Sequence, residues 1–155
     1  MDLGQKICSV IFSNAEQEFS RHLKQRNVKG ALSVVKEIIS TSEIRKFRDK
    51  TNDMSIKDFL AEVSDFYIRN PEEISDYDKT KKKWEYKSKA TGKCKFPGCE
   101  EEENLQKDHI IPSFLNKNGQ FGFIPEKRNM MPLCPFHNRV KTNSILIGIA
   151  FLVEE

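Results

Sequence analysis

The stretch LCPFHNRVKT, residues 133–142, places a histidine and an asparagine side by side shortly after a cysteine. Cys134 and His137 are separated by two residues, which is a spacing typical of paired zinc ligands. Asn138 follows directly and is left without a role in such a pair. The local fold therefore depends on what each of these two neighbouring side chains faces.

A second pair of candidate ligands precedes this stretch. CKFPGC places Cys94 and Cys99 around Pro97 and Gly98, which permit a tight turn. The two pairs are separated by 34 residues. Three thiolates and one imidazole suit a tetrahedral zinc ion, and a site with all four positions filled is structural. The alternative is four unrelated residues, against which the paired short spacings argue.

Between the two pairs lies KDHIIP, residues 107–112. The β-branched residues after His109 and the following Pro112 predict a short strand that ends at a turn. Asp108 offers an oxygen ligand for a hard cation, and a histidine has a pKa near neutrality. The Asp108–His109 pair is therefore a candidate for cation binding and for activation of water.

The order of these segments resembles the HNH endonucleases of the ββα-metal class. The resemblance rests on CKFPGC (94–99), DHIIP (108–112), NMMPLC (129–134) and HNRVK (137–141). It covers about residues 90–144, and residues 1–90 have no part in it. The family's second zinc pair is usually two cysteines followed at once by a histidine or an asparagine. Here His137 stands in place of the second cysteine, and Asn138 takes the following position.

The resemblance implies a role for each matching position. His109 would be the general base, and Asp108 and Asn138 would hold one divalent cation, Mg2+ or Mn2+. Asn129 would brace the loop that carries the base. Cys94, Cys99, Cys134 and His137 would hold the structural zinc. The implied activity is hydrolysis of phosphodiester bonds in DNA, with RNA as an alternative substrate.

Three alternatives stay open at this point. His137 could be the family's final histidine, which would leave only three cysteines for zinc. Asn129 could be a turn residue after Lys127 and Arg128. The whole module could bind nucleic acid or a protein partner without cleaving anything.

The first part of the chain has a different pattern. Residues 6–23, 28–40 and 55–71 place apolar side chains at spacings of three and four, which predicts amphipathic helices, and residues 72–89 are predicted to be helical as well. Glycine and proline become frequent from Gly92 onward. We therefore expect an α+β protein, with a helical region at 1–90 and a zinc-stabilised ββα-metal module at 91–155. The helical region could bind a protein partner, form a homodimer, or supply specificity.

Charge gives a weaker indication of the partner. The net charge of the 155-residue chain is only +3. Basic side chains gather near the end of the helical region, where Lys81, Lys82 and Lys83 could contact phosphates. Arg139 and Lys141 could do the same from the predicted helix after Cys134, although an ordinary solvated helix surface is an alternative for both groups. The acidic run at residues 100–103 would repel a phosphate backbone, so we expect it to face away from the site.

Composition limits the class of protein and its expected location in the cell. Hydrophobic residues make up 37% and charged residues 32%, which is typical of a folded protein with a modest core. The longest apolar stretch, ILIGIAFLV at 145–153, is too short to span a bilayer as a helix, so we expect no membrane association. It could pack as a strand or helix, or form an oligomer contact. We expect a cytoplasmic protein, for which a phage, mobile-element, toxin or antiviral defence setting would each be compatible.

Overall fold

The computed structural model describes residues 2–39, 54–69, 90–112, 115, 129–142 and 144–153. Four helices come first: α1 (Leu3–Phe12), α2 (Ala15–Lys24), α3 (Val28–Ile39) and α4 (Ile56–Arg69). Strands β1 (Gln106–His109) and β2 (Met130–Leu133) follow, and then helices α6 (Pro135–Lys141) and α7 (Ile145–Val153). The predicted α+β class is confirmed. The predicted helix over 72–89 lies outside the described residues.

Side-chain caps mark where α1 and α4 begin. The Asp2 carboxylate accepts a hydrogen bond from the Gln5 amide at 2.8 Å, and the Gln5 side chain accepts one from the Asp2 amide at 2.9 Å. This reciprocal pair satisfies amide groups that have no partner within the helix. The helical pattern over 6–23 is interrupted after Phe12, which the sequence reading did not predict. A side chain also caps α4, since the Ser55 hydroxyl accepts from the Asp58 amide at 3.1 Å.

The two strands form an antiparallel pair in which Asp108 lies opposite Met131 and His109 lies opposite Met130. Side chains alternate between the two faces of a strand. Asp108 and Met131 are buried, whereas His109 and Met130 are half-buried. One face of the sheet therefore packs against the protein, and the other is partly open to solvent.

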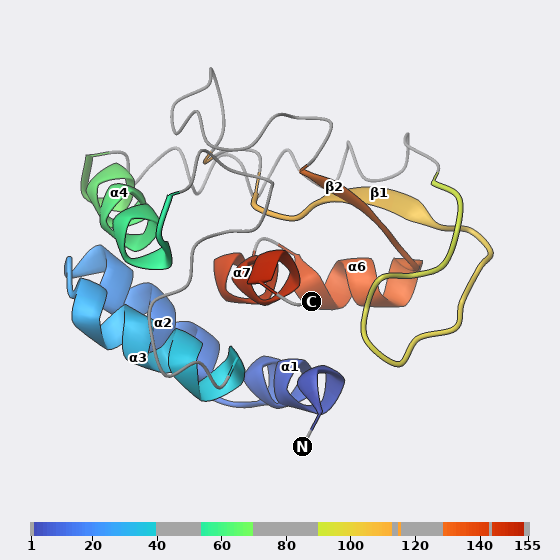
Figure 1. The fold of residues 1–155 in the computed structure, drawn as a ribbon, viewed down its shortest axis with the longest axis horizontal. Helices are drawn as coiled ribbons and strands as arrows, with labels where there is room; N and C mark the ends of the chain where they lie inside the picture. Colours follow the sequence, from blue (N-terminus) through green and yellow to red (C-terminus); the bar gives the residue numbers. More distant parts are fainter. Residues whose placement is uncertain are drawn as a thin grey trace.

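Helix α7 lies in the middle of the molecule. Figure 1 shows α6 and α7 between the strands on one side and helices α1, α2 and α3 on the other. All nine residues of α7 are apolar or glycine, and only Phe151 is not fully buried. The stretch ILIGIAFLV is thus a core helix, which explains why it is apolar on every side. Among the described residues, no helix is both long and apolar enough to cross a membrane.

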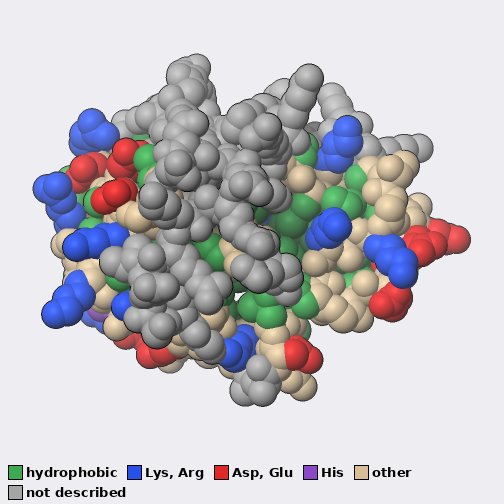
Figure 2. Space-filling view, in the orientation of Figure 1, with side chains coloured by type: hydrophobic (Ala, Val, Ile, Leu, Met, Phe, Trp, Pro, Cys, Tyr) green, Lys and Arg blue, Asp and Glu red, His purple; other side chains and the backbone are tan. Residues whose placement is uncertain are grey.

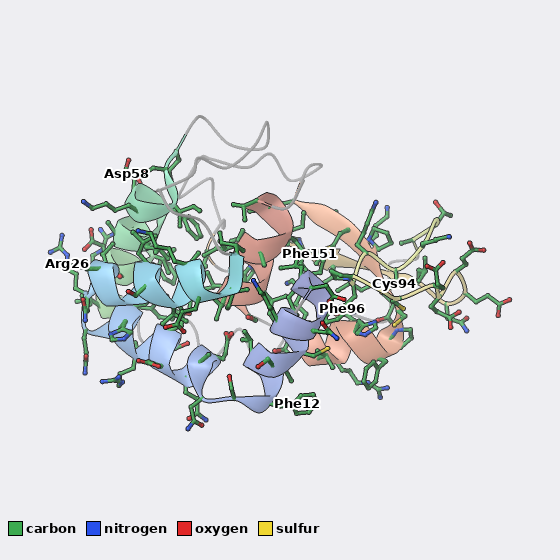
Figure 3. The ribbon with its side chains drawn as sticks, turned by 60° about the horizontal axis from the view of Figure 1, so that its bottom comes forward. Phe12, Arg26, Asp58, Cys94, Phe96 and Phe151 are labelled. Atoms are coloured by element: carbon green, nitrogen blue, oxygen red, sulfur yellow. The ribbon has the colours of Figure 1, made fainter. Side chains whose placement is uncertain are left out.

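Buried side chains from both parts of the chain belong to one core. The cluster joins Phe19 and Val35 of the helical region to Leu133 and Ile149 beyond residue 90. Within the part beyond residue 90, the ring of Phe96 packs edge to face on that of Phe151, with 6.3 Å between the ring centroids (Figure 3). The predicted boundary near residue 90 separates two patterns of sequence, but the two parts bury one another.

Candidate metal centre and neighbouring polar site

The structure brings four predicted ligands together. Donor atoms of Cys94, Cys99, Cys134 and His137 all lie within 4.8 Å of one another. The Nδ1 atom of His137 is 3.3 Å from Sγ of Cys134 and 3.5 Å from Sγ of Cys94. Three sulfur donors and one imidazole nitrogen fit a tetrahedral zinc ion. The cluster could therefore hold zinc through Nδ1 of His137.

Local geometry places each ligand. Gly98 has a φ of +86°, a conformation that glycine adopts readily, and the Cys99 amide donates to the Phe96 carbonyl at 3.0 Å. Cys134 precedes the first turn of α6, and its sulfur accepts from the His137 amide at 3.4 Å. A tight turn and a helix start therefore supply one pair of ligands each, as the spacings predicted.

The cluster lies in a partly buried, apolar environment. The Phe96 ring stacks on the His137 imidazole at 4.0 Å, with only 3° between the planes. Burial raises the pKa of the Cys94 thiol to about 11 and lowers the pKa of the His137 imidazole. A neutral imidazole has the lone pair that a metal needs, whereas the thiol must lose its proton. Zinc binding would therefore release a proton from Cys94.

The acidic run after Cys99, residues 100–103, is exposed to solvent. Lys93 Nζ lies 3.0 Å from a carboxylate oxygen of Glu100 and 4.0 Å from one of Glu102. The run is thus partly neutralised by a neighbouring lysine. Its exposed pairs contribute little to stability, because water and salt screen them.

Asp108 and Asn138 are buried polar residues on β1 and α6, two elements that contact each other. Asp108, on β1, is 3% exposed, and Asn138, on α6, is 1% exposed. Nδ2 of Asn138 donates to the Gln106 side chain at 2.7 Å. Within the described part of the chain, Oδ1 of Asn138 has no hydrogen-bond partner. A buried amide oxygen without a partner is costly, and it is a ligand type that hard cations accept.

Lys141 corrects one expectation from the sequence. It was predicted to contact phosphate from the helix surface, but its side chain is 0% exposed. Its Nζ lies 3.0 Å from Oδ2 of Asp108 and donates to the His109 carbonyl at 2.6 Å. A side chain in this position cannot reach a phosphate at the surface. The sequence reading missed this role because it depends on how α6 packs across β1.

Asn129 holds the chain that follows His109. It is fully buried, and its side chain accepts from the Ile111 amide and donates to the Ile111 carbonyl, both at 2.8 Å. The Asn129 carbonyl also accepts from the Ile110 amide at 3.0 Å. These hydrogen bonds tie Asn129 to the backbone directly after β1.

The predicted phosphate-binding residues fall into three groups. Lys81, Lys82 and Lys83 lie outside the described residues. Arg139 is exposed on α6, as predicted, and Lys141 is buried. Two exposed lysines that the sequence reading did not single out lie near the open face of the sheet.

Those two lysines are Lys95 and Lys107. Lys107 pairs with Pro132 in the sheet, and the Lys95 amide donates to the Pro132 carbonyl at 2.9 Å. They therefore flank β2 on its two sides. Figure 2 shows Lys and Arg side chains on the side of the molecule where Figure 1 places β1 and β2. Because side chains alternate between the two faces of a strand, the sequence could have indicated that Lys107 shares a face with His109.

Comparisons with protein-family models, with curated proteins and with solved structures give no match for this chain.

Proposed function

We propose that this protein is a metal-dependent endonuclease of the HNH type that hydrolyses phosphodiester bonds in DNA. The observation that carries the proposal is the burial of Asp108 on β1 and Asn138 on α6, two elements that side-chain contacts join through Gln106–Asn138 and Asp108–Lys141. Both are buried, and the amide oxygen of Asn138 has no hydrogen-bond partner within the described residues. The adjacent His109 is half-buried on the more open face of the same strand.

The chain's own residues suggest a division of labour. Asp108 and Asn138 would hold one Mg2+ or Mn2+ ion, since both offer oxygen atoms. When bound, such an ion supplies positive charge against the phosphate and the leaving oxygen. His109 would take a proton from the attacking water, for which it has to reach solvent and keep a neutral imidazole.

Two contacts would keep His109 in place during this step. Lys141 donates to the carbonyl of His109 at 2.6 Å, and Asn129 pairs with the backbone of Ile111 two residues later. Both contacts involve buried side chains, so the end of β1 is fixed before substrate arrives. Holding the reacting groups in the correct geometry before the reaction lowers the activation barrier of a proton transfer.

The substrate would approach the open face of the sheet. Lys107 shares this face with His109, and Lys95 lies beside it across β2. Arg139 is exposed on α6 and could contact a second phosphate. Lysine and arginine contacts to phosphates bind without reading sequence, so this face gives affinity and orientation.

The zinc cluster would serve the same unit as a structural clamp. Cys94 and Cys99 lie before β1, whereas Cys134 and His137 lie at the junction of β2 and α6. A bound zinc ion would tie the start of the sheet to the start of the helix. Thiolates select zinc, and the oxygen atoms of Asp108 and Asn138 select a harder ion, so the two sites would not exchange metals readily.

The test is cleavage of a supercoiled plasmid in the presence of Mg2+ or Mn2+. Zinc-loaded wild-type protein is compared with His109→Ala, and zinc content and thermal unfolding confirm that both are folded. Relaxed or linear product from the wild type alone would support the nuclease and its base. Equal cleavage by both proteins would contradict the role of His109. A parallel assay with a structured RNA distinguishes the two sugars.

A second candidate function is a zinc-stabilised binding module without cleavage activity. The observation that favours it is the buried Lys141, whose ammonium is ion-paired with the Asp108 carboxylate that would have to hold the cation. This reading predicts that the folded, zinc-loaded wild type binds DNA but produces no cleavage with either Mg2+ or Mn2+. The same plasmid experiment therefore separates the two functions.

A further inference from the structure

Lys141 is among the largest fully buried side chains of the protein. Lysine is almost never fully buried unless it is paired. Its ammonium lies 3.0 Å from the Asp108 carboxylate, and it also donates to the His109 carbonyl at 2.6 Å. A single cation thus contacts both residues of the pair that carries the proposed chemistry.

A second carboxylate stands near the same ammonium. Glu16 of α2 accepts from the Ser144 hydroxyl at 2.9 Å, and Ser144 follows Lys141 closely in the chain. Burial raises the pKa of the Glu16 carboxyl, and the Ser144 hydrogen bond and the charge of Lys141 partly offset this. Lys141 is therefore paired with the Asp108 carboxylate of β1 and also interacts electrostatically with Glu16 of the helical region.

We propose that Lys141 is a positioning residue that occupies the cation side of Asp108 and competes with the divalent ion for that carboxylate. This inference rests on the proposed function of the same site. The ammonium compensates the buried charge of Asp108 and holds the end of β1 through the His109 carbonyl. A divalent ion held by Asp108 and Asn138 would face this ammonium as a like charge.

Two opposite consequences follow from this arrangement. Removing the charge of Lys141 removes a competitor for Asp108, so a divalent cation should bind more tightly. Removing its hydrogen bond loosens the carbonyl of His109, so turnover should fall. A residue that only filled space would not raise metal affinity while lowering turnover.

The experiment measures Mn2+ binding to zinc-loaded protein by electron paramagnetic resonance, alongside plasmid cleavage. Lys141→Met removes the charge and the donor, whereas Lys141→Arg keeps a positive charge in the same place. Lys57→Met is the matched control, because Lys57 is an exposed lysine on α4. Zinc content shows that each variant retains the fold around the cluster.

We expect Lys141→Met to bind Mn2+ about tenfold more tightly than the wild type and to turn over at least about tenfold more slowly, the scale typical of changes next to a metal ligand. Lys141→Arg should keep the Mn2+ affinity of the wild type, as should Lys57→Met. If Lys141→Met does not fold alone, Mn2+ should restore its fold at concentrations that leave the melting temperature of the wild type unchanged.

Unchanged or weaker Mn2+ binding by Lys141→Met, or its failure to fold even with Mn2+, would overturn the inference. Absence of Mn2+ binding by every variant would overturn it as well. The proposed nuclease function fails separately. If the wild type does not cleave but Lys141→Met still binds Mn2+ more tightly, the competition stands and the nuclease assignment falls.

Discussion

Asn129 illustrates how one buried amide can fix a segment of backbone. Its side chain pairs with both polar groups of Ile111, at 2.8 Å each. Lys141 donates to the carbonyl of His109, two residues earlier in the chain. At the scale of single residues, the candidate site is therefore held by side chains that need not touch a substrate.

Replacing Asn129 with alanine should test this bracing. The variant leaves the amide and carbonyl of Ile111 without their partners in the interior, which costs about 1–3 kcal/mol for each group. For a chain of this size, the melting temperature should fall by roughly 5–15 °C. Thermal unfolding followed by circular dichroism measures this shift.

Asn129→Asp gives a sharper form of the same test. It keeps an oxygen for the Ile111 amide but turns an acceptor toward the Ile111 carbonyl. We expect a loss of stability as well, with cleavage reduced in both variants. A melting temperature equal to that of the wild type in Asn129→Ala would show that Asn129 is only a turn residue.

At the scale of elements, the ligand cluster and α7 support the sheet and α6 at two different places. The cluster of three cysteines and His137 lies where β2 joins α6, and α7 packs against the residue that follows β1. Gly148 of α7 faces the backbone of Ile110, the residue after His109, and an added Cβ at Gly148 would collide with the carbonyl oxygen of Ile110. The apolar helix thus supports the site directly.

Gly148→Ala should therefore disturb both stability and activity. The backbone of Ile110 cannot yield as a flexible side chain can, so we expect a loss of about 1–3 kcal/mol or more from overpacking. Gly30→Ala is the comparison on α3, because the nearest atoms that its added Cβ would meet belong to the side chains of His22 and Asn27. It should cost less than Gly148→Ala, since side chains can shift where the Ile110 backbone cannot, and alanine favours a helix more than glycine does. Equal effects of the two substitutions on the melting temperature would contradict this account.

Sequence reasoning succeeded where the information is local. The spacings of Cys94–Cys99 and Cys134–His137 predicted the ligand cluster, because a tight turn and a helix start fix such pairs without help from the rest of the chain. It was wrong about Lys141, whose neighbours come from a distant strand. It also missed the contact of Glu16 with Ser144, which joins residues 128 apart in the chain. Burial of that kind follows from tertiary packing and leaves no local pattern.

At the scale of the whole molecule, the helical region and the zinc-containing region share one core. Glu16 of α2 adds a polar contact between the two regions, because its carboxylate accepts a hydrogen bond from Ser144 at the start of α7. The helical region therefore contributes to the environment of the candidate site. A role of this region in partner binding or dimer formation stays a prediction.

Glu16 should make the stability of the protein depend on pH. Burial raises the pKa of its carboxyl above the ordinary value of 4.5, so the folded state keeps this proton to higher pH than the unfolded state does. The stabilisation is fully present below the ordinary pKa and is lost as pH rises through the folded pKa. Glu16→Gln keeps a hydrogen-bonding group beside Ser144 and has no such proton.

The melting temperature of Glu16→Gln relative to that of the wild type should therefore rise as pH increases from about 4.5 toward 8. Differential scanning calorimetry at several pH values measures the difference. A difference that stays constant over this range would mean that the Glu16 carboxyl titrates alike in the folded and unfolded states.

The most direct test of the whole account uses the adjacent residues His137 and Asn138. Zinc content and plasmid cleavage with Mg2+ are measured on the same preparations of His137→Ala, Asn138→Ala and the wild type. We predict that Asn138→Ala keeps one zinc ion per chain and loses cleavage, whereas His137→Ala binds zinc weakly and unfolds at lower temperature. Cleavage at the wild-type rate by Asn138→Ala, or loss of zinc from it, would contradict the assignment of these two neighbours to two different metals.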